Sequence, residues 1–126
     1  MQTRNILGGR RVLILEDDYL IVADLLETLQ SLGADTIGPC ATLDQARKHL
    51  QSGRPIDVAV LDVNLSGSPV FPFADELRAW GIPYVFATAY DDTFIPQVHR
   101  DVARFRKPYD VRRLAAALLE PSVAYA

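Results

Sequence analysis

The chain has 126 residues, 49% of them hydrophobic, which is enough for one compact domain with one core. A formal charge of −3 without a basic run gives no sign of a nucleic-acid or membrane-surface partner. No apolar run is long enough to cross a membrane, and the start lacks the apolar core of a signal peptide, so we expect a cytoplasmic protein. Cys40 is the single cysteine, which excludes an internal disulfide and a multi-cysteine metal site; we expect a buried or half-buried side chain.

Five short apolar runs, rich in β-branched or aromatic residues, predict strands. Each is short enough for a strand buried on both faces, which is typical of parallel sheets. The predicted strands cover residues 12–15, 36–38, 58–61, 84–87 and 102–105.

Apolar residues at helical spacing lie between these runs and predict helices. Thr42 and Gln45 form a capping box at the start of the second helix, and Asp110 can cap the last. A helix over residues 92–102 is the poorest, because Pro96 interrupts it. The other predicted helices cover residues 21–32, 42–52, 70–80 and 111–119.

This alternation of strands and helices predicts a doubly wound α/β sandwich. Five strands in so short a chain favour the flavodoxin-like parallel sheet of order 2-1-3-4-5, a (βα)5 fold. Ligands of this architecture bind beyond the carboxyl ends of the strands, where the strand order reverses. Polar side chains at strand ends are therefore the candidate site.

Such side chains follow four of the five predicted strands. In a parallel sheet these positions meet at one edge, so acids from two strands, a hydroxyl from a third and an ammonium from a fourth would form one site. The residues are Glu16, Asp17 and Asp18 after the first strand, Asp62 after the third, Thr88 after the fourth and Lys107 after the fifth.

The charges of this set indicate its chemistry. Crowded carboxylates repel unless a cation lies between them, and hard oxygen ligands favour Mg²⁺. His49 and His99 fall in a helix and in the Pro-interrupted segment, and we expect both at the surface. A metal beside a Lys and a Thr suits a phosphoryl group. The sequence has no Gly-rich loop to bind a nucleotide, so the phosphoryl group must come from another donor and be transferred to a protein nucleophile. Aspartate can be such a nucleophile, and Asp62 is the acid that lies between the others.

The motifs "VLILEDD", "VAVLDVNLSG", "FATA" and "RKP" at these spacings resemble the CheY-like receiver domain of two-component response regulators. Each motif is weak alone, but four in the right order are specific. The resemblance runs roughly from Arg11 to Leu119. We therefore expect a flexible segment over residues 1–10, the receiver domain over 11–120 and a tail over 121–126.

The resemblance implies that Asp62 is the phosphoacceptor and that Lys107 pairs with the phosphoryl group. These two residues would be the catalytic ones in a signalling domain that is not an enzyme but supports its own phosphorylation and dephosphorylation. Thr88 would be the switch hydroxyl. The bond between Lys107 and Pro108 is expected to be cis.

The resemblance also implies a Mg²⁺ site. Its ligands would be Asp17, Asp62, the backbone carbonyl of Asn64 and, through water, Glu16. Asp18 is either a helix cap or a member of the acidic pair.

One position departs from the family pattern. Many receivers carry Tyr or Phe three residues before the Lys, where this chain has Arg104; Phe105 should point to the opposite face. The stretch "PYVFATAYDD" instead resembles a PFxFATGY-type subgroup of single-domain receivers, with Ala89 where Gly is usual. Tyr90 and Arg104 are therefore candidate signalling residues, although Tyr90 also fits a half-buried packing role.

The implied partners are a sensor histidine kinase or phosphotransfer protein and a downstream protein target, with no nucleic acid and no membrane. If the chain is the full gene product, it leaves no room for an output domain, and its output is protein–protein. One alternative is a pseudo-receiver that binds partners without phosphorylation, which the complete set of site residues argues against. Another is a phosphatase-like hydrolase with an Asp nucleophile, in which Asn64 would stand where a second acid is usual.

Overall fold

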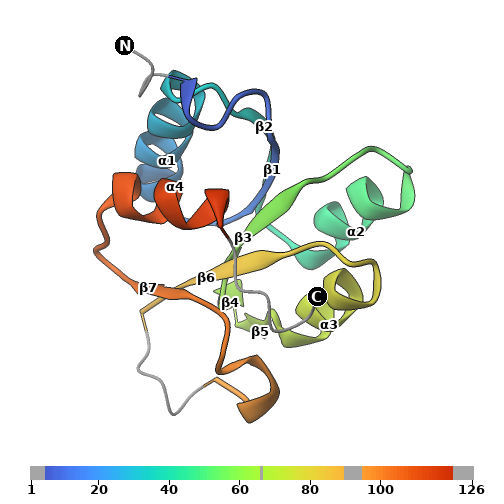
Figure 1. Ribbon diagram of the computed structural model, residues 1–126. Helices are drawn as coiled ribbons and strands as arrows, with labels where there is room; N and C mark the ends of the chain where they lie inside the picture. The colour runs from blue at the N-terminus through green and yellow to red at the C-terminus, as the bar shows by residue number, and fades with distance from the viewer. Residues whose placement is uncertain (1–4, 66, 90–94, 121–126) are drawn as a thin grey trace.

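A five-stranded parallel sheet forms the centre of the protein in a computed structural model, which describes residues 5–65, 67–89 and 95–120 (Figure 1). The order β2-β1-β3-β6-β7 is the flavodoxin-like order that the sequence predicts, so this prediction is confirmed. The strands are β1 (Arg11–Leu15), β2 (Asp35–Cys40), β3 (Val58–Asp62), β6 (Tyr84–Thr88) and β7 (Arg104–Arg106).

Within the described residues, three α-helices connect strands of the sheet and a fourth follows its last strand. Predicted side-chain caps begin two of these helices. Thr42 accepts a hydrogen bond from the amide of Gln45, whose side chain accepts one from the amide of Ala41. Asp110 accepts one from the amide of Arg112. None of the helices in the described ranges is long and apolar enough to cross a membrane. The helices are α1 (Tyr19–Ser31), α2 (Leu43–Gln51), α3 (Phe71–Ala79) and α4 (Val111–Leu119).

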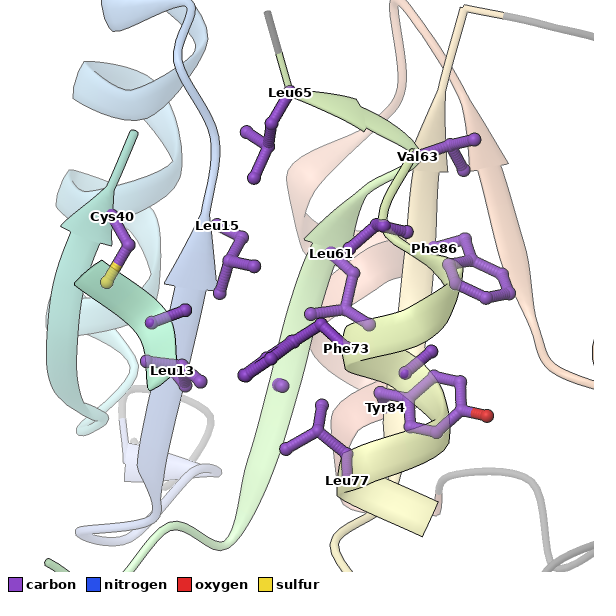
Figure 2. Close-up of a cluster of buried hydrophobic side chains, with 14 of the residues drawn as sticks. Leu13, Leu15, Cys40, Leu61, Val63, Leu65, Phe73, Leu77, Tyr84 and Phe86 are labelled. Atoms are coloured by element: carbon purple, nitrogen blue, oxygen red, sulfur yellow. The ribbon is translucent and has the colours of Figure 1, made fainter. Parts of the chain in front are cut away.

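The helices cover both faces of the sheet, so the central strands β3 and β6 are buried on both sides, whereas the edge strands β2 and β7 are partly exposed. Side chains of a strand alternate between faces, and this alternation divides the core in two. Leu13, Leu61 and Phe86 pack with α2 and α3, as Figure 2 shows for this cluster. Ile14 and Val60 pack on the other face with α1 and α4. Cys40 is 1% exposed in the first cluster, and burial raises the pKa of its thiol to about 11, so its prediction as a buried side chain is confirmed.

Three local features differ from the sequence expectation or extend it. The last strand begins at Arg104 rather than at residue 102, because Val102 closes a turn by donating its amide hydrogen to the carbonyl of His99 at 3.1 Å. Before it, the described part of the connection from β6 contains a 3₁₀-helix, Gln97–His99, instead of an α-helix. A short antiparallel hairpin of β4 (Asn64–Leu65) and β5 (Ser68–Pro69), which the sequence did not predict, follows β3.

Part of the N-terminal segment packs against the domain. Leu7 is fully buried, and its amide donates to the carbonyl of Leu32 at 2.9 Å. Gly33 has a φ of +96°, and a Cβ there would overlap the side chain of Asn5. The glycine that ends α1 therefore also makes room for residues 5–10.

His99 is buried, so the prediction that it lies at the surface is wrong; His49 on α2 is half-buried. The ring of His99 is held at both nitrogens, by the Tyr84 hydroxyl at 2.8 Å and by the Asp75 carboxylate at 3.0 Å. It also stacks on Phe71, with ring centroids 5.7 Å apart. Because a carboxylate only accepts, the Nε2 atom of His99 donates to Asp75 and the Nδ1 atom accepts from Tyr84. These partners offset the cost of burying the ring.

Burial lowers the pKa of His99, although the negative charges of Asp75 and Asp101 act against that change. The unfolded chain then binds more protons than the folded chain just below the ordinary pKa of 6.5. We therefore expect His99 to make the free energy of unfolding fall as the pH drops below that value. In urea titrations, the free energy of unfolding should fall more between pH 7.5 and pH 5.5 for wild type than for His99→Gln. At pH 7.5 the substitution itself should lower this free energy by about 1–3 kcal/mol. The control His49→Gln should lose as much free energy of unfolding between the two pH values as wild type does. If His99→Gln also lost as much as wild type, this account of His99 would be wrong.

Candidate functional site

The predicted site residues meet at the carboxyl edge of the sheet. Glu16 and Asp17 directly follow β1, and Asp62 and Thr88 are the last residues of β3 and β6. Lys107 directly follows β7. The pairing of β3 with β1 and β6 is parallel and in register, which brings these positions to one edge. The polar residues therefore gather at the place where the strand order reverses, which is where this architecture binds ligands.

A buried ion cluster forms the centre of the site. The Nζ atom of Lys107 lies 3.0 Å from a carboxylate oxygen of Glu16 and 3.2 Å from one of Asp62. Glu16 and Asp62 are 3% and 5% exposed, and the Lys107 side chain is 17% exposed. In this position one ammonium pairs with two acids that have little contact with water.

Asp17 adds a third carboxylate on the open side of this pair. Single oxygens of Glu16, Asp17 and Asp62 lie within 4.8 Å of one another. Asp17 is exposed, whereas the other two are buried, so the group opens to solvent on one side. Three carboxylates opposite one ammonium leave a surplus of negative charge, which a small divalent cation with oxygen ligands fits.

The pKa values of the cluster reflect this crowding. The pKa of Glu16 is raised to about 7, first by burial and next by the negative charge of Asp62. Burial lowers the pKa of Lys107, but the hydrogen bond and charges of the two acids outweigh burial and leave it above its ordinary value. The ammonium therefore stays charged, and the repulsion between the acids shows in the raised pKa of Glu16.

Two neighbours fix the orientation of the acids. The amide of Asn64 donates to the second oxygen of Asp62 at 3.2 Å, and the amide of Asp18 donates to Glu16 at 3.1 Å. The Asp18 side chain itself accepts from the amides of Leu20 and Ile21, at 3.0 and 3.4 Å. Of its two predicted roles, Asp18 is thus the N-cap of α1, and the acids at the site come from the residues before it.

Thr88 and Lys107 are linked through the backbone. The amide of Lys107 donates to the carbonyl of Thr88 at 2.8 Å, and Thr88 is 1% exposed. The bond between Lys107 and Pro108 is cis, as predicted. The last residue of β6 and the cation of the site are therefore neighbours across the strand ends.

The two candidate signalling residues have different outcomes. The guanidinium of Arg104 donates to the carbonyl of Arg100, and to that of Val102 at 3.4 Å, so it folds back onto the connection between β6 and β7. Phe105 packs with the core cluster of α1 and α4, which confirms that it points away from the face of Arg104. Tyr90 lies outside the described residues.

Tyr109 is a neighbour of the site that the sequence analysis missed. Burial and then the negative charges of Glu16, Asp62 and Asp24 raise the pKa of its hydroxyl. Its position two residues after Lys107 would have indicated its closeness to the site. The half-buried ring adds an apolar wall beside the acids.

Comparisons with known proteins agree with this geometry. No protein-family model matches the chain. The BeF₃-activated structure of SdrG from Pseudomonas melonis Fr1 is 35% identical, with a TM-score of 0.73, and the match covers 89% of this chain and 98% of SdrG. The receiver domain of the response regulator PhyR from Erythrobacter litoralis is 26% identical, with a TM-score of 0.75, covering 90% of this chain and 91% of that one.

A curated relative extends the comparison to whole proteins. The transcriptional regulatory protein PdtaR of Mycobacterium tuberculosis (strain H37Rv) is 30% identical over 113 residues, which are 86% of this chain and 55% of PdtaR. The chain spans about half the length of the curated relatives it matches. Strand order, the ion cluster at the strand ends and these likenesses lead to one conclusion: the chain belongs to the receiver-domain family of two-component response regulators.

Proposed function

We propose that this receiver accepts a phosphoryl group on Asp62 from a sensor histidine kinase or a phosphotransfer protein, and that it signals by binding a target protein. The observation that carries the proposal is the buried Asp62 carboxylate, 3.2 Å from the Lys107 ammonium and beside Glu16 and Asp17. In support, SdrG was solved in a BeF₃-activated conformation, and beryllofluoride stands in for a phosphoryl group.

Asp62 is oriented for attack on phosphorus. One oxygen accepts from the amide of Asn64 and the other from Lys107, each at 3.2 Å, so the carboxylate has little freedom to rotate. In the transfer, an Asp62 oxygen forms the new bond to phosphorus while the phosphorus–nitrogen bond to the donor imidazole breaks. The electron pair of that bond leaves with the imidazole. Lys107 then faces the oxygens of the phosphoryl group, whose charge it offsets.

The acids would hold Mg²⁺. The direct ligands would be Asp17, Asp62 and the backbone carbonyl of Asn64, with Glu16 reached through water. The close spacing of the three carboxylates fits such an ion, which typically keeps several waters. When bound, Mg²⁺ supplies positive charge against the phosphoryl oxygens. The domain would then support its own phosphorylation and dephosphorylation without a separate catalyst.

The signal would leave the site through Thr88. Its hydroxyl can donate to a phosphoryl oxygen on Asp62, and the connection to β7 begins directly after it. Arg104 occupies the position where an aromatic switch residue is usual, so we assign the rearrangement to this connection, including Tyr90. The ring of His99, held by Tyr84 and Asp75, would anchor its far end.

Asp62→Ala tests the phosphoacceptor. Incubation with acetyl phosphate and Mg²⁺ should add one phosphoryl mass to wild type and none to the variant, because the variant lacks the carboxylate that faces Lys107 at the end of β3. Intact-protein mass spectrometry measures this. Asp44→Ala, which removes a highly exposed acid on α2, is the matched control and should be labelled like wild type. Equal labelling of Asp62→Ala would refute the assignment.

Asp17→Asn and Asp18→Asn test the metal ligands. Asn can still cap α1, so Asp18→Asn should leave Mg²⁺ affinity within about twofold, whereas Asp17→Asn removes a ligand and should weaken it by at least about tenfold. Titration of Mg²⁺ followed by the shifts of nearby backbone amides gives both affinities. The reverse order would mean that the acidic pair lies one residue later.

Lys107→Ala tests the coupling between the site and the surface. The variant should still bind beryllofluoride with Mg²⁺, but the amide shifts beyond Thr88 should shrink to less than about half of those in wild type, since the ammonium no longer draws the end of β7 toward the charge. Lys48→Ala, an exposed lysine on α2, is the control. If Lys107→Ala gives the same shifts as wild type, Lys107 does not couple the site to the surface.

A further inference from the structure

The hydroxyl group of Tyr109 is buried without a hydrogen-bond partner. Its oxygen has almost no contact with solvent, and no atom of the residues that the structure describes forms a hydrogen bond with it. A hydroxyl that is buried in this way lowers the stability of the fold, because it has given up its bonds to water. A physical reason is therefore needed for a tyrosine, rather than a phenylalanine, at this position.

Packing holds the ring of Tyr109 in place. The ring lies against the core cluster of α1 and α4. The next residue, Asp110, caps α4 with its side chain, and Val111 after it is buried. Before the ring, the amide of Lys107 bonds to the carbonyl of Thr88. The position of the hydroxyl is therefore tied to the backbone that carries the ammonium of the site.

Tyr109 and Lys107 line the same groove. It has a volume of about 440 Å³ and lies between the first half of α1 and the segment that leads into α4. Apolar side chains such as Leu20 and Ile21 of α1 form much of its lining. Because the ammonium of Lys107 also pairs with the buried acids, this groove adjoins the ion cluster, and the Tyr109 ring lies where the two meet.

The acids of the site act on this hydroxyl. The pKa of Tyr109 is raised, first by burial and then by the negative charges of Glu16, Asp62 and Asp24, in that order. The hydroxyl is therefore neutral and has one hydrogen to donate. Asp24 is exposed, so water can bond to its oxygens, whereas Glu16 is 3% exposed and depends on donors inside the protein. Glu16 is thus the acid that would gain most from this donor.

Glu16 has its donors in the unphosphorylated domain. The Lys107 ammonium lies 3.0 and 3.2 Å from its two oxygens, and the amide of Asp18 donates to one of them at 3.1 Å. A phosphoryl group on Asp62 would compete for the same ammonium, because it carries more negative charge than a carboxylate. Bonding that the ammonium gives to the phosphoryl group is lost to Glu16. A buried carboxylate that loses its cation is strongly unfavourable.

We propose that Tyr109 is a positioning residue whose hydroxyl replaces Lys107 as the donor to Glu16 when Asp62 is phosphorylated. Tyr109 is two residues after Lys107, so a backbone movement that brings the ammonium toward the phosphoryl group also moves the hydroxyl. The new hydrogen bond offsets what Glu16 loses. The inference deepens the proposed function and rests on it, since the exchange of donors needs a phosphoryl group on Asp62.

Tyr109→Phe separates this role from a structural one, because it keeps the ring and removes only the hydroxyl. The urea midpoint of the unphosphorylated variant should equal or exceed that of wild type, since the hydroxyl has no partner in that state. Its affinity for beryllofluoride with Mg²⁺, measured by titration of backbone amide shifts, should nonetheless fall about tenfold. The control Tyr19→Phe removes a hydroxyl at the start of α1, where the side chain is 78% exposed, and should change neither value.

A spectroscopic measurement follows the hydroxyl itself. In a chain with ¹³C-labelled tyrosine, the Cζ resonance of the Tyr109 ring reports whether the hydroxyl donates a hydrogen bond. This resonance is assigned by its loss in Tyr109→Phe. We expect it to move when beryllofluoride and Mg²⁺ are added to wild type, and to stay in place in Asp62→Ala. The Cζ resonance of Tyr19 should stay in place in both proteins.

Three results would overturn the proposal. A lower urea midpoint for Tyr109→Phe would show that the hydroxyl already stabilises the unphosphorylated domain. Unchanged affinity of this variant for beryllofluoride, or an unmoved Tyr109 resonance in wild type that has bound it, would show that no exchange of donors takes place. Failure of the proposed function would appear in wild type itself, which would then take no phosphoryl group from acetyl phosphate. Labelled wild type beside a Tyr109→Phe variant of equal affinity would refute the role of Tyr109 alone.

Discussion

The pairing of Lys107 with the two buried acids is the constraint on which the site depends. Each acid loses most of its hydration, and two carboxylates this close would repel if no cation were present. The ammonium can reach both only because β1, β3 and β7 end at the same edge of the sheet. A parallel sheet gives that arrangement from strands far apart in sequence, which is why the fold and the chemistry of the site cannot be separated.

The negative charge of this cluster exceeds the positive charge of its one ammonium. The one ammonium of Lys107 faces two carboxylates, Asp17 adds a third that is exposed, and the pKa of Glu16 stays high. A site that holds surplus negative charge binds a divalent cation at little reorganisation, since its ligands already face one another. The repulsion destabilises the folded chain locally, and the cation and phosphoryl group of the proposed function would relieve it.

The sequence predicted what is regular and local. Apolar runs located the five strands of the sheet, turn and cap residues located the four α-helices, and strand ends located the acids, Thr88 and Lys107. It did not predict the burial of His99, because the partners that make burial possible, Tyr84 and Asp75, are 15 and 24 residues away in sequence. The hairpin after β3 and the packing of Leu7 also depend on tertiary contacts, which single-residue preferences do not report.

The site continues into one short strand at the edge of the sheet. β7 has three residues, and Lys107, which carries the ammonium of the site, is the next residue after Arg106. The amide of Lys107 bonds to the carbonyl of Thr88, so the shift of Thr88 toward Asp62 that we propose would pull on the backbone where β7 ends. The alternation that turns Lys107 toward β6 turns Arg106 outward. A displacement at the acids would therefore reach the outward backbone of Arg106 without any aromatic residue crossing the sheet.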